Sequence, residues 1–229
     1  MIPESKPRFR GEEGTQYNNT LKLWKWERMA NASRQKEEKF NYLEENFVFY
    51  GSYHNDAVNQ MIHICFVWPI LISALVLISY IPGVHTSSGI DVDLSLVITA
   101  YYSLTYAIIE LPGFAGLLAS GMVIGCHFLA HYLKSDAALG ASAWEVSLVI
   151  HITSWLAQFY GHAFHEGRSP ALLSNLYQAL VMAPLFVLME VLFKIGYRPN
   201  FRLKCQRQID KNIENFNYKL KKSRERNLR

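Results

Sequence analysis

Histidines in apolar surroundings are the feature of this sequence most able to support chemistry. Seven of the eight lie within or beside strongly apolar segments, namely His54, His63, His127, His131, His151, His162 and His165. An ionisable side chain at membrane depth is costly unless it has a partner or a function. For any single histidine the alternative is a packing role, with its ring bonded to a neighbouring carbonyl. A set clustered in this way favours a metal site.

The available donor atoms restrict the kind of metal. Cys65, Cys126 and Cys205 show no ligand spacing, so we expect neither a thiolate zinc site nor a disulfide framework. Imidazole suits Zn, Cu, Fe and Ni, and a histidine-rich site with open positions suits Fe(II) and O₂ chemistry. Zinc-dependent hydrolysis stays open, because composition does not choose between these metals.

Two pairs of possible ligands have the spacing of one helix face. His127 and His131 are four residues apart, so both point the same way from a helix. They could therefore present two imidazoles to one metal ion. His162 and Glu166 have the same spacing, provided that helix continues through residue 166.

His54 and His63 can share a metal only if the chain bends between them. They are nine residues apart, which is about 180° around a straight helix. A helix that starts near Asn55 or Asp56 would provide the bend, because both residue types are good N-caps. His54 would then precede the helix, and Asn59 and His63 would lie one turn apart within it.

Apolar segments must position these side chains. Five are visible, at residues 61–82, 94–111, 113–133, 144–160 and 176–197. The first contains no Asp, Glu, Lys or Arg and is long enough to cross about 30 Å of hydrocarbon. Between Tyr50 and Lys194 the only Lys or Arg residues are Lys134 and Arg168. This distribution is typical of a chain whose outside is solvated by lipid.

Charge in the two tails sets the expected topology. Of the 23 Lys and Arg residues, nine lie before Tyr50 and twelve from Lys194 onward, so we expect both ends in the cytosol. An even number of crossings is then required. Segment 144–160 is short and relatively polar, and we expect it to be re-entrant or buried. The predicted fold is an all-α polytopic membrane helix bundle with five hydrophobic segments, four of which cross fully.

The domain organisation follows from the same pattern. We expect a polar cytosolic tail at residues 1–45, a membrane-embedded catalytic domain at residues 46–200 and a basic cytosolic tail at residues 201–229. The net charge of +4 comes from the tails, and we interpret it as a positive-inside signal with some attraction to anionic lipid heads. Nothing supplies a nucleic-acid-binding fold, so we expect membrane lipid and not nucleic acid as a partner.

Two stretches of the chain resemble the motifs of a known family. Residues 155–176, WLAQFYGHAFHEGRSPALLSNL, and residues 53–63, YHNDAVNQMIH, are similar to those of the 2-hydroxy fatty acid dioxygenases of fungi, plants and bacteria. The likeness covers roughly residues 46–200. It implies an enzyme of the endoplasmic reticulum membrane that binds Fe(II) and O₂. The enzyme would shorten a 2-hydroxy long-chain fatty acid by one carbon with release of CO₂, which in fungi serves phytosphingosine breakdown.

The resemblance also implies a set of iron ligands. By motif position these are His54, His63 and His162, together with one histidine from the 94–133 hairpin. We choose His131 for the last because it ends the apolar arm, and His127 is the alternative.

Other polar residues of the motifs have expected supporting roles. Glu166 could bind the iron itself or accept a hydrogen bond from a ligand histidine, and we favour the second role. Asn59 and Gln158 could support the site in the same way. Arg168 could dock the substrate carboxylate, and a salt bridge to Glu166 or a lipid-phosphate contact is the alternative. The resemblance does not require His151 or His165, and we expect His85 to be a solvated loop residue.

Two other functions compete with this prediction. A di-iron membrane hydroxylase or desaturase shares lipid substrates and H-x-x-x-H pairs, but it usually has an adjacent histidine pair, which this chain lacks. A lipid-binding or scaffold protein of the endoplasmic reticulum would not need the histidines to bind metal at all. Metal content and its stoichiometry separate the three possibilities.

Overall fold

Helices make up nearly all of the regular structure in the computed structural model, which describes residues 40–85, 91–111, 113–135, 142–169 and 175–227. In chain order the helical elements are α2 (Tyr42–Ser52), α3 (Ala57–Ser79), α4 (Leu94–Ile109), α5 (Ala115–Ser135), α6 (Ala143–Tyr160), the π-helical turns η1 (Gly161–Glu166) and η3 (Gln178–Met182), α7 (Ala183–Lys194) and α8 (Pro199–Asn227). Strands β1 (Val84–His85) and β2 (Asp91–Val92) form one antiparallel pair. The prediction of an all-α fold is confirmed, and each of the five apolar segments is helical.

The number of membrane crossings differs from the prediction. Among the described residues, α3 and α5 are long and apolar enough to cross a membrane. A third span exists only if the η3–α7 segment and α8, which meet at a bend of 114°, are counted together. Helix α4 is apolar but has 16 residues, about 24 Å of helix. The chain is therefore compatible with a membrane, whereas neither the count of five membrane segments nor that of four crossings is confirmed.

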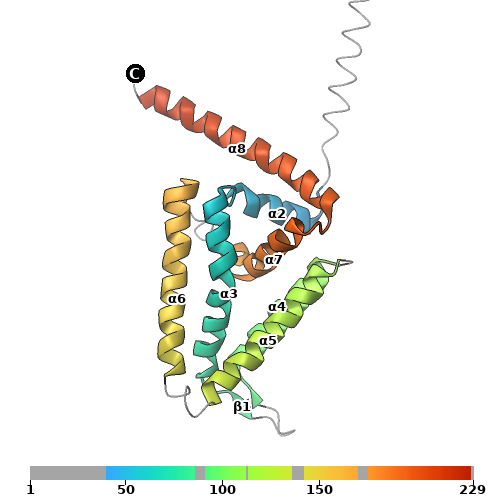
Figure 1. The fold of residues 1–229 in the computed structure, drawn as a ribbon, viewed down its shortest axis with the longest axis vertical. Helices are drawn as coiled ribbons and strands as arrows, with labels where there is room; N and C mark the ends of the chain where they lie inside the picture. The colour runs from blue at the N-terminus through green and yellow to red at the C-terminus, as the bar shows by residue number, and fades with distance from the viewer. Residues whose placement is uncertain (1–39, 86–90, 112, 136–141, 170–174, 228–229) are drawn as a thin grey trace, which may run out of the picture. The chain divides into compact units, whose positions relative to one another are not determined.

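Helix α3 is the central element of the bundle. It packs lengthwise against α6, and it also contacts α4, α5, α7 and η1 (Figure 1). Helices α4 and α5 form a hairpin beside it. Helix α2 contacts α7 and α8 near the first turns of α3, and β1 lies near its last turns (Figure 1). Side chains at the two ends of α3 consequently face different neighbours.

Capping side chains decide where α2 and α3 begin. Asn41 and Glu44 bond to each other's backbone N–H groups and form a capping box at the start of α2. The Asp56 carboxylate accepts hydrogen bonds from the N–H groups of Val58 and Asn59 and starts α3. The chain therefore bends over residues 53–56, as the sequence predicts, with Asp56 as the cap.

Aromatic side chains join α2 to the C-terminal helices. The Phe47 ring of α2 lies 5.5 Å from Phe186, 5.4 Å from Phe193 and 5.7 Å from Phe201, measured between ring centroids. All three contacts have the edge-to-face geometry that aromatic pairs prefer. This cluster fixes the position of α2, which leads directly into the bend before α3.

A buried carboxylate connects the hairpin turn to the α7–α8 junction. Glu110 is fully buried and accepts hydrogen bonds from the Gly116 N–H at 3.1 Å, the Tyr197 hydroxyl at 2.9 Å and Arg198 Nη1 at 2.7 Å. A buried charge is tolerated only when it is paired and hydrogen-bonded in this way. The 94–133 hairpin is thus held against the C-terminal part of the bundle.

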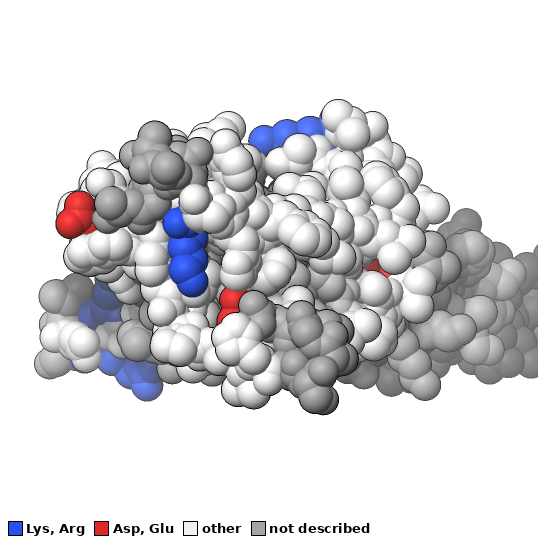
Figure 2. All heavy atoms as spheres, turned by 90° about the horizontal axis from the view of Figure 1, so that it is seen from below, with Lys and Arg blue, Asp and Glu red and all other residues white. Residues whose placement is uncertain are grey.

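Much of the protein surface is apolar. Seen end-on in Figure 2, the described surface consists mostly of uncharged residues, with few Lys, Arg, Asp or Glu side chains. Large hydrophobic side chains are exposed along the hairpin and α6, including Leu104, Ile108, Phe128, Val149 and Leu156. Exposed apolar surface on this scale marks a contact with lipid or with another protein.

The structure describes little of the predicted N-terminal tail and nearly all of the predicted C-terminal tail. Residues 1–39, which contain most of the predicted N-terminal tail, lie outside the described residues. The predicted C-terminal tail at residues 201–229 forms most of α8. Its first turns bury Phe201, Cys205 and Ile209, and α8 packs against α2. The start of this segment is therefore part of the same compact unit, residues 41–229, as the membrane-compatible helices.

Candidate metal centre

Three buried imidazoles meet beside the first turns of α3. His54 lies in the bend before α3, His63 on α3 and His162 on η1, and each is at most 5% exposed. His54 Nε2 and His63 Nε2 are 3.0 Å apart, and the His162 ring centroid lies 4.8 and 5.0 Å from those of His54 and His63. The possible ligand atoms of all three lie within 4.8 Å of one another. We call this group the histidine triad.

Backbone carbonyls fix the orientation of two of these rings. His54 Nδ1 lies 2.7 Å from the Tyr50 carbonyl oxygen, and His63 Nδ1 lies 2.9 Å from that of Asn59. A carbonyl oxygen only accepts, so each Nδ1 must carry the proton. Each neutral ring then presents the lone pair of Nε2, and this is the arrangement found for metal-ligating histidines.

The ring nitrogens of the triad are arranged to suit a bound cation. In these tautomers two acceptor atoms, His54 Nε2 and His63 Nε2, face each other at 3.0 Å. Burial, with the facing imidazoles of His63 and His162, holds the pKa of His54 well below its usual range, so a proton does not readily relieve this contact. His162 Nδ1 is buried without a hydrogen-bond partner in the described part of the chain. A metal ion bound by the triad would satisfy these nitrogens.

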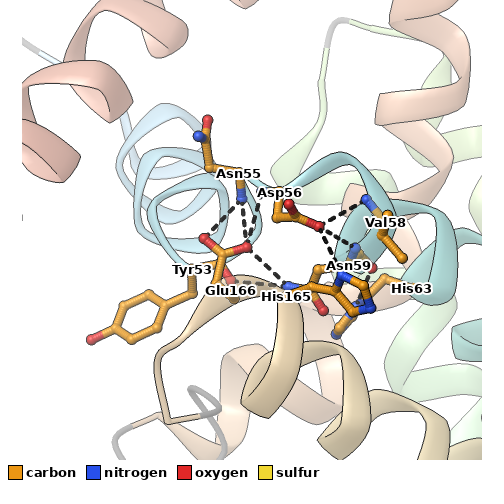
Figure 3. Close-up of polar contacts among 8 residues, drawn as sticks. All are labelled: Tyr53, Asn55, Asp56, Val58, Asn59, His63, His165 and Glu166. Atoms are coloured by element: carbon orange, nitrogen blue, oxygen red, sulfur yellow. Dashed lines mark hydrogen bonds and ion pairs between the residues drawn. The ribbon is translucent and has the colours of Figure 1, made fainter.

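Glu166 ties η1 to the bend that carries His54. Its carboxylate accepts the N–H of Asn55 at 3.1 Å, that of Asp56 at 3.0 Å and Asn59 Nδ2 at 3.2 Å (Figure 3). We expected Glu166 to accept from a histidine ring, and the structure instead pairs it with backbone amides and with Asn59. Its carboxylate therefore positions the segments that bear the triad.

The π-helical turn η1 brings His162 and Glu166 to their partners. The α6 helix does not continue as α-helix through residue 166 but widens at Gly161, and the turn ends at Gly167 in the left-handed conformation, with φ 66°. Such π-turns occur frequently at functional sites. Gly161 packs so closely on α3 that a Cβ atom there would collide with Asn59 Oδ1. Any larger residue at this crossing would force the Asn59 side chain to move.

Arg168 does not point into the site. Its Nη1 donates to the Ser52 carbonyl oxygen at 2.5 Å, and its guanidinium lies 3.6 Å from the centroid of the Phe216 ring on α8. It is not among the residues that line the cavity beside the triad. This placement differs from the suggested role of docking a substrate carboxylate. The contacts of Arg168 instead link the segment after η1 to α2 and α8.

An uncharged cavity of about 320 Å³ opens beside the triad. It follows one face of α3 from His63 past Leu71 and Ala74 to Ile78. Its described lining includes His54 and His162 at one end and no Asp, Glu, Lys or Arg. Such a cavity can take an apolar ligand whose polar end reaches the triad.

The histidines expected from the hairpin lie elsewhere. His131 and His127 form a group with Asp93 in which all possible ligand atoms are within 4.8 Å. They line a cavity with Ser79 at the last turn of α3, sixteen residues and about 24 Å along the helix from His63. His131 therefore does not complete the triad, and neither does the alternative, His127. Their helix meets α3 at its far end.

The remaining histidines have other neighbours. His151 lines the middle of the cavity, where Nδ1 is 3.0 Å from Ser73 Oγ and Nε2 accepts from Trp155 Nε1 at 3.1 Å. His165 lies outside the triad, with Nδ1 3.9 Å from Asp56 Oδ1. His85 is an exposed residue of β1.

Comparison with known proteins identifies the family. Residues 40–195 match the family described as "2-hydroxy-palmitic acid dioxygenase Mpo1-like". The 2-hydroxy-palmitic acid dioxygenase MPO1 of Saccharomyces cerevisiae is 32% identical over 180 residues, which cover 79% of this chain and 95% of the relative. The chain belongs to the Mpo1-like family. No solved structure matches it.

The Mpo1-like match confirms the resemblance inferred from the two motifs. It contains the whole triad, Asn59 and Glu166, and it ends before α8.

Other residues at the site carry no sequence signal of their own. Gln178 and Tyr102 line the cavity, yet each is an isolated polar or aromatic residue in an apolar segment, and only the folded bundle brings them to it.

Replacement of Gly161 by alanine should weaken metal binding. The added methyl group must displace Asn59 and with it the Glu166 carboxylate, and loss of such supporting contacts typically lowers metal affinity about 10- to 100-fold. Gly121→Ala on α5 is the matched control, because a Cβ there meets no atom within 4 Å. Titration of both purified variants with Fe(II), together with thermal unfolding, measures the effect. Equal affinity in the two variants would show that the Gly161 crossing does not position the triad.

Proposed function

We propose that the chain is an Fe(II)-dependent dioxygenase that shortens 2-hydroxy long-chain fatty acids by one carbon. The observation that carries this proposal is the buried histidine triad at the end of an uncharged cavity in a member of the Mpo1-like family. In the balanced reaction, one 2-hydroxy acid and one O₂ give the acid shorter by one carbon, one CO₂ and one water. All electrons that O₂ requires come from the substrate, so no external reductant is needed.

His54, His63 and His162 would bind the iron. A set of neutral imidazoles that leaves open positions suits Fe(II), which supplies the O₂ chemistry when bound. The protein keeps both Nε2 lone pairs of His54 and His63 directed inward through the carbonyls of Tyr50 and Asn59. The Tyr50 ring stacks on one face of the His54 ring, with centroids 4.1 Å apart.

A neutral side chain, and not Arg168, would recognise the polar end of the substrate. Gln158 lines the cavity, is 5% exposed, and its Nε2 has no hydrogen-bond partner among the described residues. A buried donor left unpaired is costly. Gln158 would donate a hydrogen bond to the carboxylate or the 2-hydroxyl group and so orient the carbons that react.

The cavity length supports a long-chain substrate. From His63 to Ile78 it follows fifteen residues of α3, about 22 Å. One lipid acyl chain spans about half of a bilayer core that is roughly 30 Å thick. The cavity can therefore accommodate a whole long acyl chain, and its apolar walls would exclude water from the reacting end.

We place the enzyme in the endoplasmic reticulum membrane with both ends in the cytosol. The exposed apolar side chains of the hairpin and α6 would contact lipid. Basic residues of α8 would remain at the cytosolic surface, where anionic lipid heads attract them. The substrate would enter the cavity from the surrounding lipid.

The di-iron alternative is not favoured by the positions of the two possible metal groups. Paired metals in one active site lie about 3.5–4 Å apart. The triad and the Asp93 group lie near opposite ends of α3, about 24 Å apart along the helix. A scaffold role without metal gives no reason for two buried lone pairs that face each other.

A product assay tests the activity. The purified full-length chain, supplied with Fe(II), O₂ and 2-hydroxypalmitic acid labelled at the carboxyl carbon, should release labelled CO₂ and the acid one carbon shorter. His63→Ala and His162→Ala should each lose more than about 100-fold in turnover, beyond the effect typical of a supporting residue. His165→Ala, a histidine of the same turn outside the triad, should retain it. Absence of the shorter acid with substrates of several chain lengths would refute the proposal.

Ala74→Phe should shorten the acyl chain that the enzyme prefers. Ala74 lines the cavity about 16 Å along α3 from His63, and a phenyl ring there would block its far part. We expect kcat/KM for the longest substrate to fall roughly 10-fold or more, as overpacking costs about 1–3 kcal/mol, while that for shorter substrates is retained. Ala100→Phe is the control, since Ala100 is exposed on α4. An equal loss at every chain length would place the acyl chain elsewhere.

A further inference from the structure

A second group of possible metal ligands lies at the far end of α3. Asp93 precedes α4, and His127 and His131 occupy the last turns of α5. Asp93 Oδ2 is 3.0 Å from His131 Nε2, and the two imidazole centroids are 4.6 Å apart. We propose that Asp93, His127 and His131 bind one zinc-like divalent cation, separately from the triad and independently of the proposed activity.

The Asp93 carboxylate is held in place by contacts that a metal would not disturb. Its Oδ1 accepts the Leu96 N–H at 2.8 Å, as the cap of α4, and the Ser95 hydroxyl at 2.8 Å. Its Oδ2 faces His131. One oxygen thus anchors the carboxylate, and the other, which contacts His131 Nε2 in the structure, would coordinate the cation together with that ring.

The two histidines converge on the same point. They are four residues apart on α5, so both project from one face of the helix. His127 Nδ1 lies 3.1 Å and His131 Nε2 lies 3.2 Å from Ser95 Oγ, which is fully buried. In the structure this hydroxyl and Asp93 keep both rings turned inward. The three ligand atoms are therefore gathered before any ion binds.

The site is open to an ion from solution. His131 is 40% and Asp93 13% exposed, and the group lines a cavity of about 430 Å³. Lys134 also lines this cavity, but its amine donates to the Ser79 carbonyl oxygen at 2.6 Å and lies 5.2 Å from the Tyr80 ring centroid. Its amine is therefore held by groups other than the three proposed ligands.

The donor atoms specify the class of metal. One carboxylate oxygen with two imidazole nitrogens suits a borderline divalent ion such as Zn²⁺, which accepts three protein ligands and a water molecule. The ligands come from the start of α4 and the end of α5, so a bound ion would join the open ends of the hairpin. Its role would be structural, because binding to the folded state alone stabilises it.

Zinc stoichiometry tests the proposal on the full-length protein. After removal of metal by a chelator, titration with Zn²⁺ and elemental analysis should give two ions per chain, since the triad also suits zinc. Asp93→Asn, which retains a good N-cap, and His127→Gln should each give one. His63→Ala should also give one ion per chain, and His63→Ala combined with Asp93→Asn should give none. His85→Gln, a histidine of the same cavity outside the group, should still give two.

Thermal unfolding separates binding from damage to the fold. Zn²⁺ should raise the melting temperature of His63→Ala, in which only the second site remains, and should not raise that of His63→Ala combined with Asp93→Asn. Two ions in Asp93→Asn and in His127→Gln would overturn the proposal, as would one ion in the wild type that is lost only with His63. Failure of the dioxygenase assay has no bearing on either result.

Discussion

The Glu166 carboxylate makes the contact on which the site depends. It joins η1 to the backbone amides of Asn55 and Asp56 and to the Asn59 side chain, so one anion fixes the bend, the start of α3 and the turn η1 relative to each other. Each of these segments carries one histidine of the triad. Hydrogen bonds to a charged acceptor are stronger than those between neutral groups. The π-turn at Gly161 is the backbone adjustment that allows this contact.

The sequence predicts the local part of this arrangement well. A good cap at residues 55–56 was enough to predict the bend, because a cap fixes where a helix begins and hence which way His54 and His63 face. The family motifs supplied His162, which no spacing argument links to α3. The role of the three as metal ligands stays a prediction. The π-turn was not predicted, since no simple residue pattern distinguishes it from continued α-helix.

The sequence did not predict which parts of the bundle residues far apart in the chain would contact. The end of the apolar arm suggests His131 as the fourth ligand, yet spacing within α5 does not say which end of α3 it will meet. The rarity of cations in this region suggests Arg168 for docking the substrate carboxylate, with a salt bridge or a lipid contact as the alternative, whereas the structure engages it with Ser52 and Phe216. In a bundle centred on one helix about 34 Å long, such choices decide between opposite ends of the molecule.

The central claim is that His54, His63 and His162 together bind one iron ion. X-ray absorption at the iron edge of the Fe(II)-loaded protein, in an Asp93→Asn background that disables the second site, measures this directly. Three imidazole nitrogens should coordinate the iron, and one of them should be lost in His162→Ala. A spectrum without imidazole scattering, or one that His162→Ala leaves unchanged, would contradict it.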